Sequence, residues 1–174
     1  MRFGVPEHAH TLQGAGERGP LVASESDLRL VRRQHRLFYA LLFVSPVEWW
    51  WRGRPAGLGQ VVGALVFLAG VVGYRVAGGT LGAQLSPLVA PREPARLVVH
   101  GPYASVRHPM YAAELAMAAG APWTLAAKAS AVLALLFAVT LLRRLRVEEH
   151  ALEERLPEYA EYARRTYRVI PYVY

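Results

Sequence analysis

The chain has 174 residues, of which 53% are hydrophobic and 19% are charged. So much apolar surface excludes a wholly disordered chain, and the charged fraction is lower than in a typical soluble domain. Cysteine is absent, which excludes disulfides, thiolate metal sites and a cysteine nucleophile. The formal net charge of +7 fits either nucleic acid or an anionic membrane surface, and the position of the charges decides between them.

The N-terminal segment 1–30 is expected to form a polar, mobile tail. Its first 27 residues are Gly-rich and show no sustained hydrophobic period. They contain no apolar run of signal-peptide length followed by a small-residue cleavage site. His8 and His10 could pair at a metal ion, but two histidines in a tail are more often solvated. We therefore predict no metal site.

Two apolar segments follow the tail. Leu37–Trp51 and Leu58–Ala77 contain few strongly polar residues. They predict two N-terminal membrane helices within residues 31–78.

A third apolar tract, Met110–Leu142, is too long for one span. The sequence Gly120-Ala121-Pro122 interrupts it, and glycine and proline commonly punctuate helices. The tract therefore predicts a helical hairpin with arms at Met110–Ala121 and Pro122–Leu142. The second arm is close to the ~20 residues that a bilayer core requires. The shorter first arm must begin earlier or lie shielded inside the protein.

The cations orient these segments. Fifteen arginines lie on one set of flanks, four from Arg29 to Arg36, four from Arg75 to Arg107 and seven after Leu142, against three cations on the opposite flanks. The positive-inside rule then places both termini and this loop in the cytoplasm, with Trp49–Trp51 at the other interface. The sequence thus predicts an all-α, polytopic integral membrane protein with about four membrane segments. Its expected partner is the lipid bilayer, not nucleic acid.

Three glycines, Gly59, Gly63 and Gly70, share one face of the second apolar segment. Small residues at this spacing allow close helix packing in lipid. The packing could lie within one chain or between two, so the oligomeric state stays open.

The most polar loop, Arg96–Tyr111, contains the turn-forming pairs Gly101-Pro102 and His108-Pro109. Because proline suits the first position of a helix, Pro109 is expected to open the next helix. Amide groups at a helix start attract anions. The loop could therefore hold a polar cofactor, or it could be a well-capped interfacial loop with snorkelling side chains.

A second polar segment begins where the last apolar segment ends. Arg144 and Glu148 are four residues apart, so they are neighbours on a helix. They could form a solvated ion pair or belong to a site. A short helix with Tyr159 and Tyr162 is expected next, lying in the membrane interface or covering a site as a lid.

These two segments, with the hairpin between them, resemble the isoprenylcysteine carboxyl methyltransferase family and the related phospholipid methyltransferases. The resemblance covers roughly residues 80–171, and we assign a methyltransferase-like module to residues 79–174. Its most specific elements are Arg107-His108-Pro109-x-Tyr111 and Glu148-Glu149. It implies S-adenosyl-L-methionine as methyl donor and a lipophilic acceptor that enters from the bilayer.

The resemblance also implies site residues. It places Arg144 on the acceptor side. The candidate cofactor-binding residues are Leu97, Val98, Gly101, Tyr103, Arg107, His108, Pro109, Met110, Tyr111, Glu148 and Glu149.

Glu114 is the second candidate catalytic residue beside Arg144. An acidic side chain within a membrane segment is costly and usually faces a cavity or a partner. Glu114 could bind the acceptor or remove a proton, or it could be a structural partner of Arg75 or Arg107.

The predicted function is methyl transfer to a lipophilic acceptor, a carboxylate as in isoprenylcysteine carboxyl methyltransferases. A carboxylate is already ionised at neutral pH, whereas an amine acceptor must lose a proton. A phospholipid N-methyltransferase is the nearest alternative. An NADPH-dependent membrane reductase and a non-enzymatic membrane scaffold are alternatives from other classes.

Overall fold

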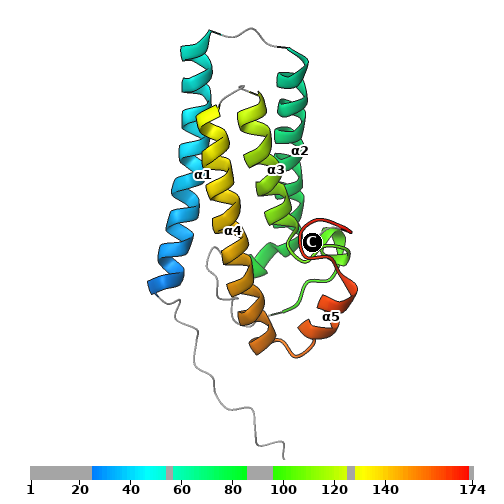
Figure 1. Ribbon diagram of the computed structural model, residues 1–174. Coiled ribbons are helices and arrows are strands. Elements are labelled where there is room, and N and C mark those ends of the chain that lie inside the picture. Colours follow the sequence, from blue (N-terminus) through cyan, green and yellow to red (C-terminus); the bar gives the residue numbers. More distant parts are fainter. Residues whose placement is uncertain (1–24, 54–56, 86–95, 125–127, 173–174) are drawn as a thin grey trace, which may run out of the picture.

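The computed structural model describes residues 25–53, 57–85, 96–124 and 128–172 (Figure 1). The helices are α1 (Glu25–Arg52), α2 (Leu58–Leu81), α3 (Pro109–Thr124), α4 (Lys128–Arg155) and the short α5 (Tyr159–Arg165). Two 3-10 turns, η1 (Gly82–Gln84) and η2 (Gly101–Ala104), lie between α2 and α3. In these ranges, β structure is limited to one isolated bridge between Val106 and Tyr167. The predicted all-α class is confirmed.

The four long helices form a bundle in which α3 occupies a central place. α2 packs along α3, α1 packs along α4, and α3 also contacts both α4 and α1. Figure 1 shows the first turns of α1 and the last turns of α4 at the same end of the bundle, together with α5 and η2. The polar segments of the chain therefore gather at one end.

Close packing between α2 and α3 depends on glycine. A Cβ atom added at Gly70 would lie 2.7 Å from the carbonyl oxygen of Ala113, and one at Gly120 would lie 2.6 Å from the amide nitrogen of Phe67. Gly63, also buried, brings its carbonyl oxygen within 2.7 Å of the same added atom at Gly120. The predicted packing role is confirmed for Gly63 and Gly70, and the contact lies within one chain.

The hydrophobic core lies between α1, α3 and α4. Leu41, Phe137, Leu141 and Leu145 are fully buried there. Val169 joins the same cluster, so the segment after α5 folds back onto the bundle.

The predicted hairpin turn at Gly120-Ala121-Pro122 is wrong, because α3 continues through these residues to Thr124 and α4 begins at Lys128. Gly120 serves the contact with α2 instead. Pro122 lies two residues before the end of α3, so its missing N–H costs one helical hydrogen bond without ending the helix there. The two arms are therefore shifted along the chain from the predicted boundaries.

The predicted tail is also too long at its C-terminal end. α1 begins at Glu25, so residues 25–30 are helical. Glu25 pairs with Arg29 one turn later at 3.5 Å, and an acidic side chain in the first turn favours a helix start. The first 24 residues, with His8 and His10, lie outside the described part of the chain.

One helix of the described residues, Leu58–Gln84, is long and apolar enough to cross a membrane, with a mean hydropathy of 1.9 over its best window. α1 and α4 each have 28 residues and combine an apolar stretch with an arginine-containing end. α3 has 16 residues. The number of spans and their orientation remain predictions.

Candidate cofactor and acceptor site

The loop before α3 is tied to the C-terminal segment by backbone hydrogen bonds. The amide of Arg107 donates to the carbonyl of Tyr167 at 2.8 Å, and the amide of His108 donates to that of Arg168 at 3.0 Å. In return, the amide of Tyr167 donates to the carbonyl of Ser105 at 2.9 Å. The loop and the chain end thus form one unit. α3 begins at Pro109, as the sequence predicts.

The turn η2 holds a buried tyrosine that contacts α5. Gly101 has φ +60°, and a Cβ there would lie 3.2 Å from the methyl carbon of Thr80, so this turn requires glycine. The buried Tyr103 follows in the turn, and its carbonyl accepts a 2.7 Å hydrogen bond from the hydroxyl of Tyr162. Burial raises the pKa of Tyr162 to about 12. The phenol therefore stays protonated and remains a donor at neutral pH.

Glu149 is the centre of a buried charge cluster at this end of the bundle. Its carboxylate lies 2.8 Å from Nε of Arg168, and 3.5 Å from both Nη1 of Arg107 and Nε2 of His108. The hydroxyl of Tyr159 donates to it at 3.4 Å. Burial alone would raise the pKa of Glu149, but His108 and the charges of Arg107 and Arg168 lower it. Glu149 is thus ionised and joins α4, the loop and the C-terminal segment.

A second buried cluster crosses three helices. Arg144 Nε donates to Glu148 at 3.0 Å, and its Nη1 donates to the side-chain oxygen of Gln34 at 2.9 Å. Gln34 in turn donates from Nε2 to Glu114 at 2.7 Å. Arg144 is 6% exposed and Gln34 is 1% exposed. The cluster therefore connects α4, α1 and α3 away from solvent.

Two expectations for these residues are corrected. Arg144 and Glu148 form a buried pair, so the solvated-face alternative is wrong. Glu114 contacts Gln34, whereas Arg107 pairs with Glu149 and Arg75 is exposed. The structural alternative for Glu114 therefore named the wrong partners.

Tyr111 links the two clusters. Its ring stacks on that of His108, with centroids 5.4 Å apart and planes at 8°. The guanidinium carbon of Arg144 lies 5.7 Å from the same ring, a distance suited to a cation–π contact. The hydroxyl of Tyr111 is buried beside the carboxylate of Glu148. Such a group is suited to meet a polar ligand.

The remaining candidate residues lie at the edges of this region. Leu97 packs against the cluster formed by Leu156, Tyr159 and Tyr162, and Val98 beside it is half-buried. Met110 faces α2, where its methyl group would contact a Cβ at Gly78 at 3.8 Å. The fold thus brings the predicted residues to one end of the bundle, in two clusters and a hydrophobic rim.

Sequence reasoning missed Gln34. Val31, Gln34, Leu41 and Ser45 are all buried, and their spacing of three, seven and four residues places them on one helix face. Gln34 is thus a polar side chain on the inward face of α1, and this pattern was the available signal. The described residues bring together no group of three His, Asp or Glu residues that could bind a metal ion.

Two curated relatives carry names from metal resistance. The chain is 36% identical over 115 residues to the cobalt-zinc-cadmium resistance protein CzcN of Cupriavidus metallidurans, covering 65% of this chain and 52% of that one. It is 28% identical over 152 residues to the nickel-cobalt-cadmium resistance protein NccN of Alcaligenes xylosoxydans xylosoxydans, covering 76% and 71%. The chain thus spans about half the length of the first relative.

The fold is similar to a solved structure of the eukaryotic intramembrane Ras methyltransferase, an isoprenylcysteine carboxyl methyltransferase. The TM-score is 0.61 at 20% identity, over 88% of this chain and 55% of that chain. Residues 62–154, more than half of the sequence, match the isoprenylcysteine carboxyl methyltransferase family. This chain therefore belongs to the isoprenylcysteine carboxyl methyltransferase family.

Proposed function

We propose that this protein is an integral membrane methyltransferase that transfers a methyl group from S-adenosyl-L-methionine to a lipophilic acceptor. The observation that carries the proposal is the stack of Tyr111 on His108, with the ring of Tyr111 also close to Arg144. It joins the two motifs that resemble the family, although they are far apart in sequence. The family match over 62–154 supports the reaction class.

The residues at this end fit the chemistry of the donor. Glu148 can accept hydrogen bonds from its ammonium group, and amides of the Gly101–Ala104 turn can meet its carboxylate. The buried hydroxyl of Tyr111 offers one more polar contact. The apolar contacts of the adenine and ribose would come from Leu97, Val98, Tyr103, Pro109 and Met110.

When bound, the donor supplies an electrophilic methyl group on a positively charged sulfur. The protein's own task is to align the acceptor and to exclude water, because methyl transfer is an in-line displacement. The ring of Tyr111 presents a π face that attracts positive charge. Glu149 is a positioning residue in this scheme, since it holds the loop and the C-terminal segment in place.

We assign Arg144 and Glu114 to the acceptor side. The positive charge of Arg144 attracts a carboxylate, and a carboxylate acceptor needs no base. An acceptor carboxylate near Arg144 is therefore the preferred substrate.

One observation favours the alternative, a phospholipid N-methyltransferase. Glu114 accepts a hydrogen bond from Gln34, which in turn accepts one from Arg144. A carboxylate in this position could take the proton that an amine must lose. The nature of the acceptor is thus a question for experiment.

We also infer a cytoplasmic position for both termini and for the 78–109 loop, with membrane helices in 31–78 and the methyltransferase module in 79–174. The arginine distribution supports this orientation. The donor is water-soluble, so a cytoplasmic site gives it access while the acceptor enters from the bilayer.

The proposal is tested by methyl transfer in detergent or liposomes. Purified protein is given donor with a labelled methyl group and either a farnesylated cysteine or phosphatidylethanolamine. We expect label in the farnesylcysteine as a base-labile methyl ester. Stable N-methyl label in the phospholipid would select the alternative, and no transfer to a panel of lipophilic acids and amines would contradict the proposal.

A further inference from the structure

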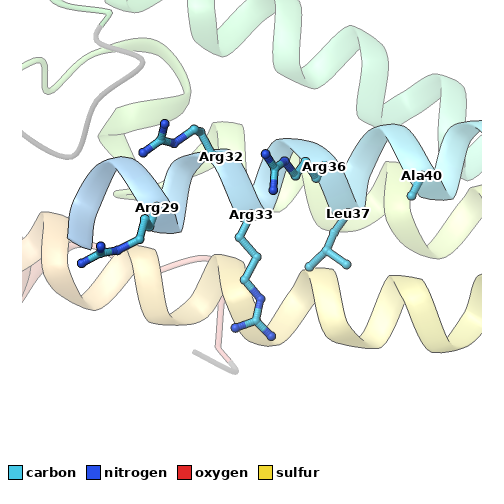
Figure 2. A pocket seen from close by; sticks show the side chains of 6 residues that line it. All are labelled: Arg29, Arg32, Arg33, Arg36, Leu37 and Ala40. Atoms are coloured by element: carbon cyan, nitrogen blue, oxygen red, sulfur yellow. The ribbon is translucent and has the colours of Figure 1, made fainter. Parts of the chain in front are cut away.

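A pocket of about 540 Å³ lies at the N-terminal end of α1, outside the clusters described above. Its lining residues are Arg29, Arg32, Arg33, Arg36, Leu37 and Ala40. Figure 2 shows Arg32 and Arg36 extending to one side of the helix and Arg29 and Arg33 to the other, with Leu37 and Ala40 further along. The four guanidinium groups thus form two pairs on opposite sides of the same helical turns.

These arginines have capacity to bind an anion. Arg29 shares an exposed ion pair with Glu25, and Arg32 donates from Nε to the carbonyl of Leu28. For Arg33 and Arg36 the described part of the chain provides neither an ion pair nor a hydrogen bond. Four cations within eight residues attract negative charge, and a guanidinium binds phosphate oxygens bidentately.

The side of α1 that carries Arg32 and Arg36 becomes apolar further along the helix. Arg32, Arg36, Tyr39, Phe43 and Val47 follow one another at spacings of three or four residues, which places them on one stripe. Tyr39, Phe43 and Val47 are 67%, 73% and 52% exposed. At 1.5 Å per residue, the stripe from Arg36 to Val47 is roughly 16 Å long, about half of a bilayer core. One outer face therefore has a cationic end and an apolar length that matches one leaflet.

We propose that this pocket binds the phosphate headgroup of an anionic phospholipid whose acyl chains lie along Tyr39, Phe43 and Val47. A free phosphate ion would satisfy the arginines but would leave the apolar stripe uncovered, so the lipid accounts for both halves of the face. The site is separate from the proposed methyl transfer, since Gln34, the α1 residue in the Arg144 cluster, is 1% exposed whereas the arginines of the pocket are exposed.

The test compares lipid adducts by native mass spectrometry of the full chain in detergent. The probes are phosphatidylglycerol, phosphatidylcholine with the same acyl chains, and inorganic phosphate as competitor. The site variant is Arg32→Gln with Arg36→Gln. The matched control, Arg143→Gln with Arg146→Gln, removes the same charge from exposed positions on α4. Thermal unfolding of each variant without lipid checks the fold.

We expect wild type to bind phosphatidylglycerol more tightly than phosphatidylcholine, and the α1 variant to weaken this binding roughly tenfold to thirtyfold. The α4 control should stay within about threefold of wild type. Equal loss in both variants, or no preference for phosphatidylglycerol in wild type, would overturn the proposal, and the wild-type result decides even if a variant does not fold. Full competition by inorganic phosphate would show a free-anion site and would also overturn it.

Discussion

Arg144 has its hydrogen bonds directed to two different helices, to Glu148 on its own helix and to Gln34 on α1. This use of Nε and Nη1 depends on the fork of the guanidinium, which lysine lacks. The charge alone is therefore not the property that the cluster requires.

We predict that Arg144→Lys leaves the affinity for S-adenosylhomocysteine within about threefold of wild type but lowers methyl transfer to a carboxylate acceptor by at least about tenfold, the loss expected for a charge-assisted hydrogen bond. Both are measured on one preparation. Arg146→Lys, at an exposed position on the same helix, is the matched control. A fall in donor affinity as large as the fall in turnover would place Arg144 in the cofactor site.

Glu149 makes its contacts with segments that are distant in sequence. We predict that Glu149→Gln lowers the free energy of unfolding by about 2–3 kcal/mol, because Arg107 and Arg168 lose a buried ionic partner. Thermal unfolding in detergent measures the loss. Glu153→Gln, one turn further along and exposed, should change it by less than about 0.5 kcal/mol. Equal stability of both variants would show that the cluster contributes little.

The lowered pKa of Glu149 gives this effect a pH dependence. A carboxyl with a lower pKa in the folded state stabilises the fold at pH values above its unfolded pKa, and the stabilisation is lost as the pH falls through the folded value. We therefore expect the difference between wild type and Glu149→Gln to be full at pH 7 and to shrink below the ordinary value of 4.5. A difference that grows on acidification would contradict the assignment.

The candidate residues were predictable where local spacing decides their contacts. The four-residue separation of Arg144 and Glu148 indicates their pairing, and the helix start at Pro109 follows from the fixed φ of proline. The burial of that pair depends on how α1 packs, as does the contact of Gln34 with Glu114. A single sequence without long-range contacts does not contain that information.

At the scale of elements, α1 and α4 are joined at the end opposite the clusters. Glu48 of α1 accepts hydrogen bonds from the amides of Ala129 and Ser130, at 3.1 Å and 3.3 Å to its Oε2. A carboxylate at these otherwise unpaired amides stabilises the start of a helix. This cap could not be predicted from the residues that precede α4, because the carboxylate comes from another helix.

The α2–α3 contact makes the sharpest prediction at this scale. We expect Gly70→Ala to lower the free energy of unfolding by about 1–3 kcal/mol, since the new methyl would lie 2.7 Å from the carbonyl oxygen of Ala113 and 2.9 Å from the amide nitrogen of Met117. Gly79→Ala is the matched control, because nothing lies within 4 Å of a Cβ there. Alanine favours a helix over glycine by about 0.5–1 kcal/mol.

The midpoint of thermal unfolding should therefore fall for Gly70→Ala. For Gly79→Ala it should rise or stay unchanged. Similar destabilisation of both would mean that the loss comes from the backbone and not from the contact between α2 and α3.

The starts of two of the four long helices were predicted correctly. The start of α2 at Leu58 and that of α3 at Pro109 agree with the predictions to within one residue. The hairpin turn was misplaced because Gly120 was taken as a helix breaker, whereas its missing side chain allows contact with Phe67. Glycine has both uses, and the neighbouring helix determines which one applies.

For the whole molecule, the orientation in the membrane is the first prediction to test. We expect a reporter that is active only outside the cytoplasm to be silent when fused after Tyr174 and active when inserted at 54–56, next to Arg52. The arginine distribution around the apolar segments is the physical reason. A strong signal from the C-terminal fusion would place the proposed donor site on the wrong side of the membrane.

The molecule is a bundle of largely apolar helices with one polar end. That end holds the Arg144 and Glu149 clusters. The family resemblance indicated this plan from the motifs alone. It could not indicate the arginine pocket on α1, which lies outside the 62–154 family match.

The central claim is donor binding at the polar end, and calorimetric titration tests it most directly. Purified wild type is titrated with S-adenosylhomocysteine and with NADPH, and Glu148→Gln is titrated with the former. We predict one-site binding of S-adenosylhomocysteine and no saturable heat with NADPH. Glu148→Gln should weaken the affinity roughly tenfold or more, since it removes a charge-assisted hydrogen bond. Saturable binding of NADPH without binding of S-adenosylhomocysteine to the folded protein would contradict the account.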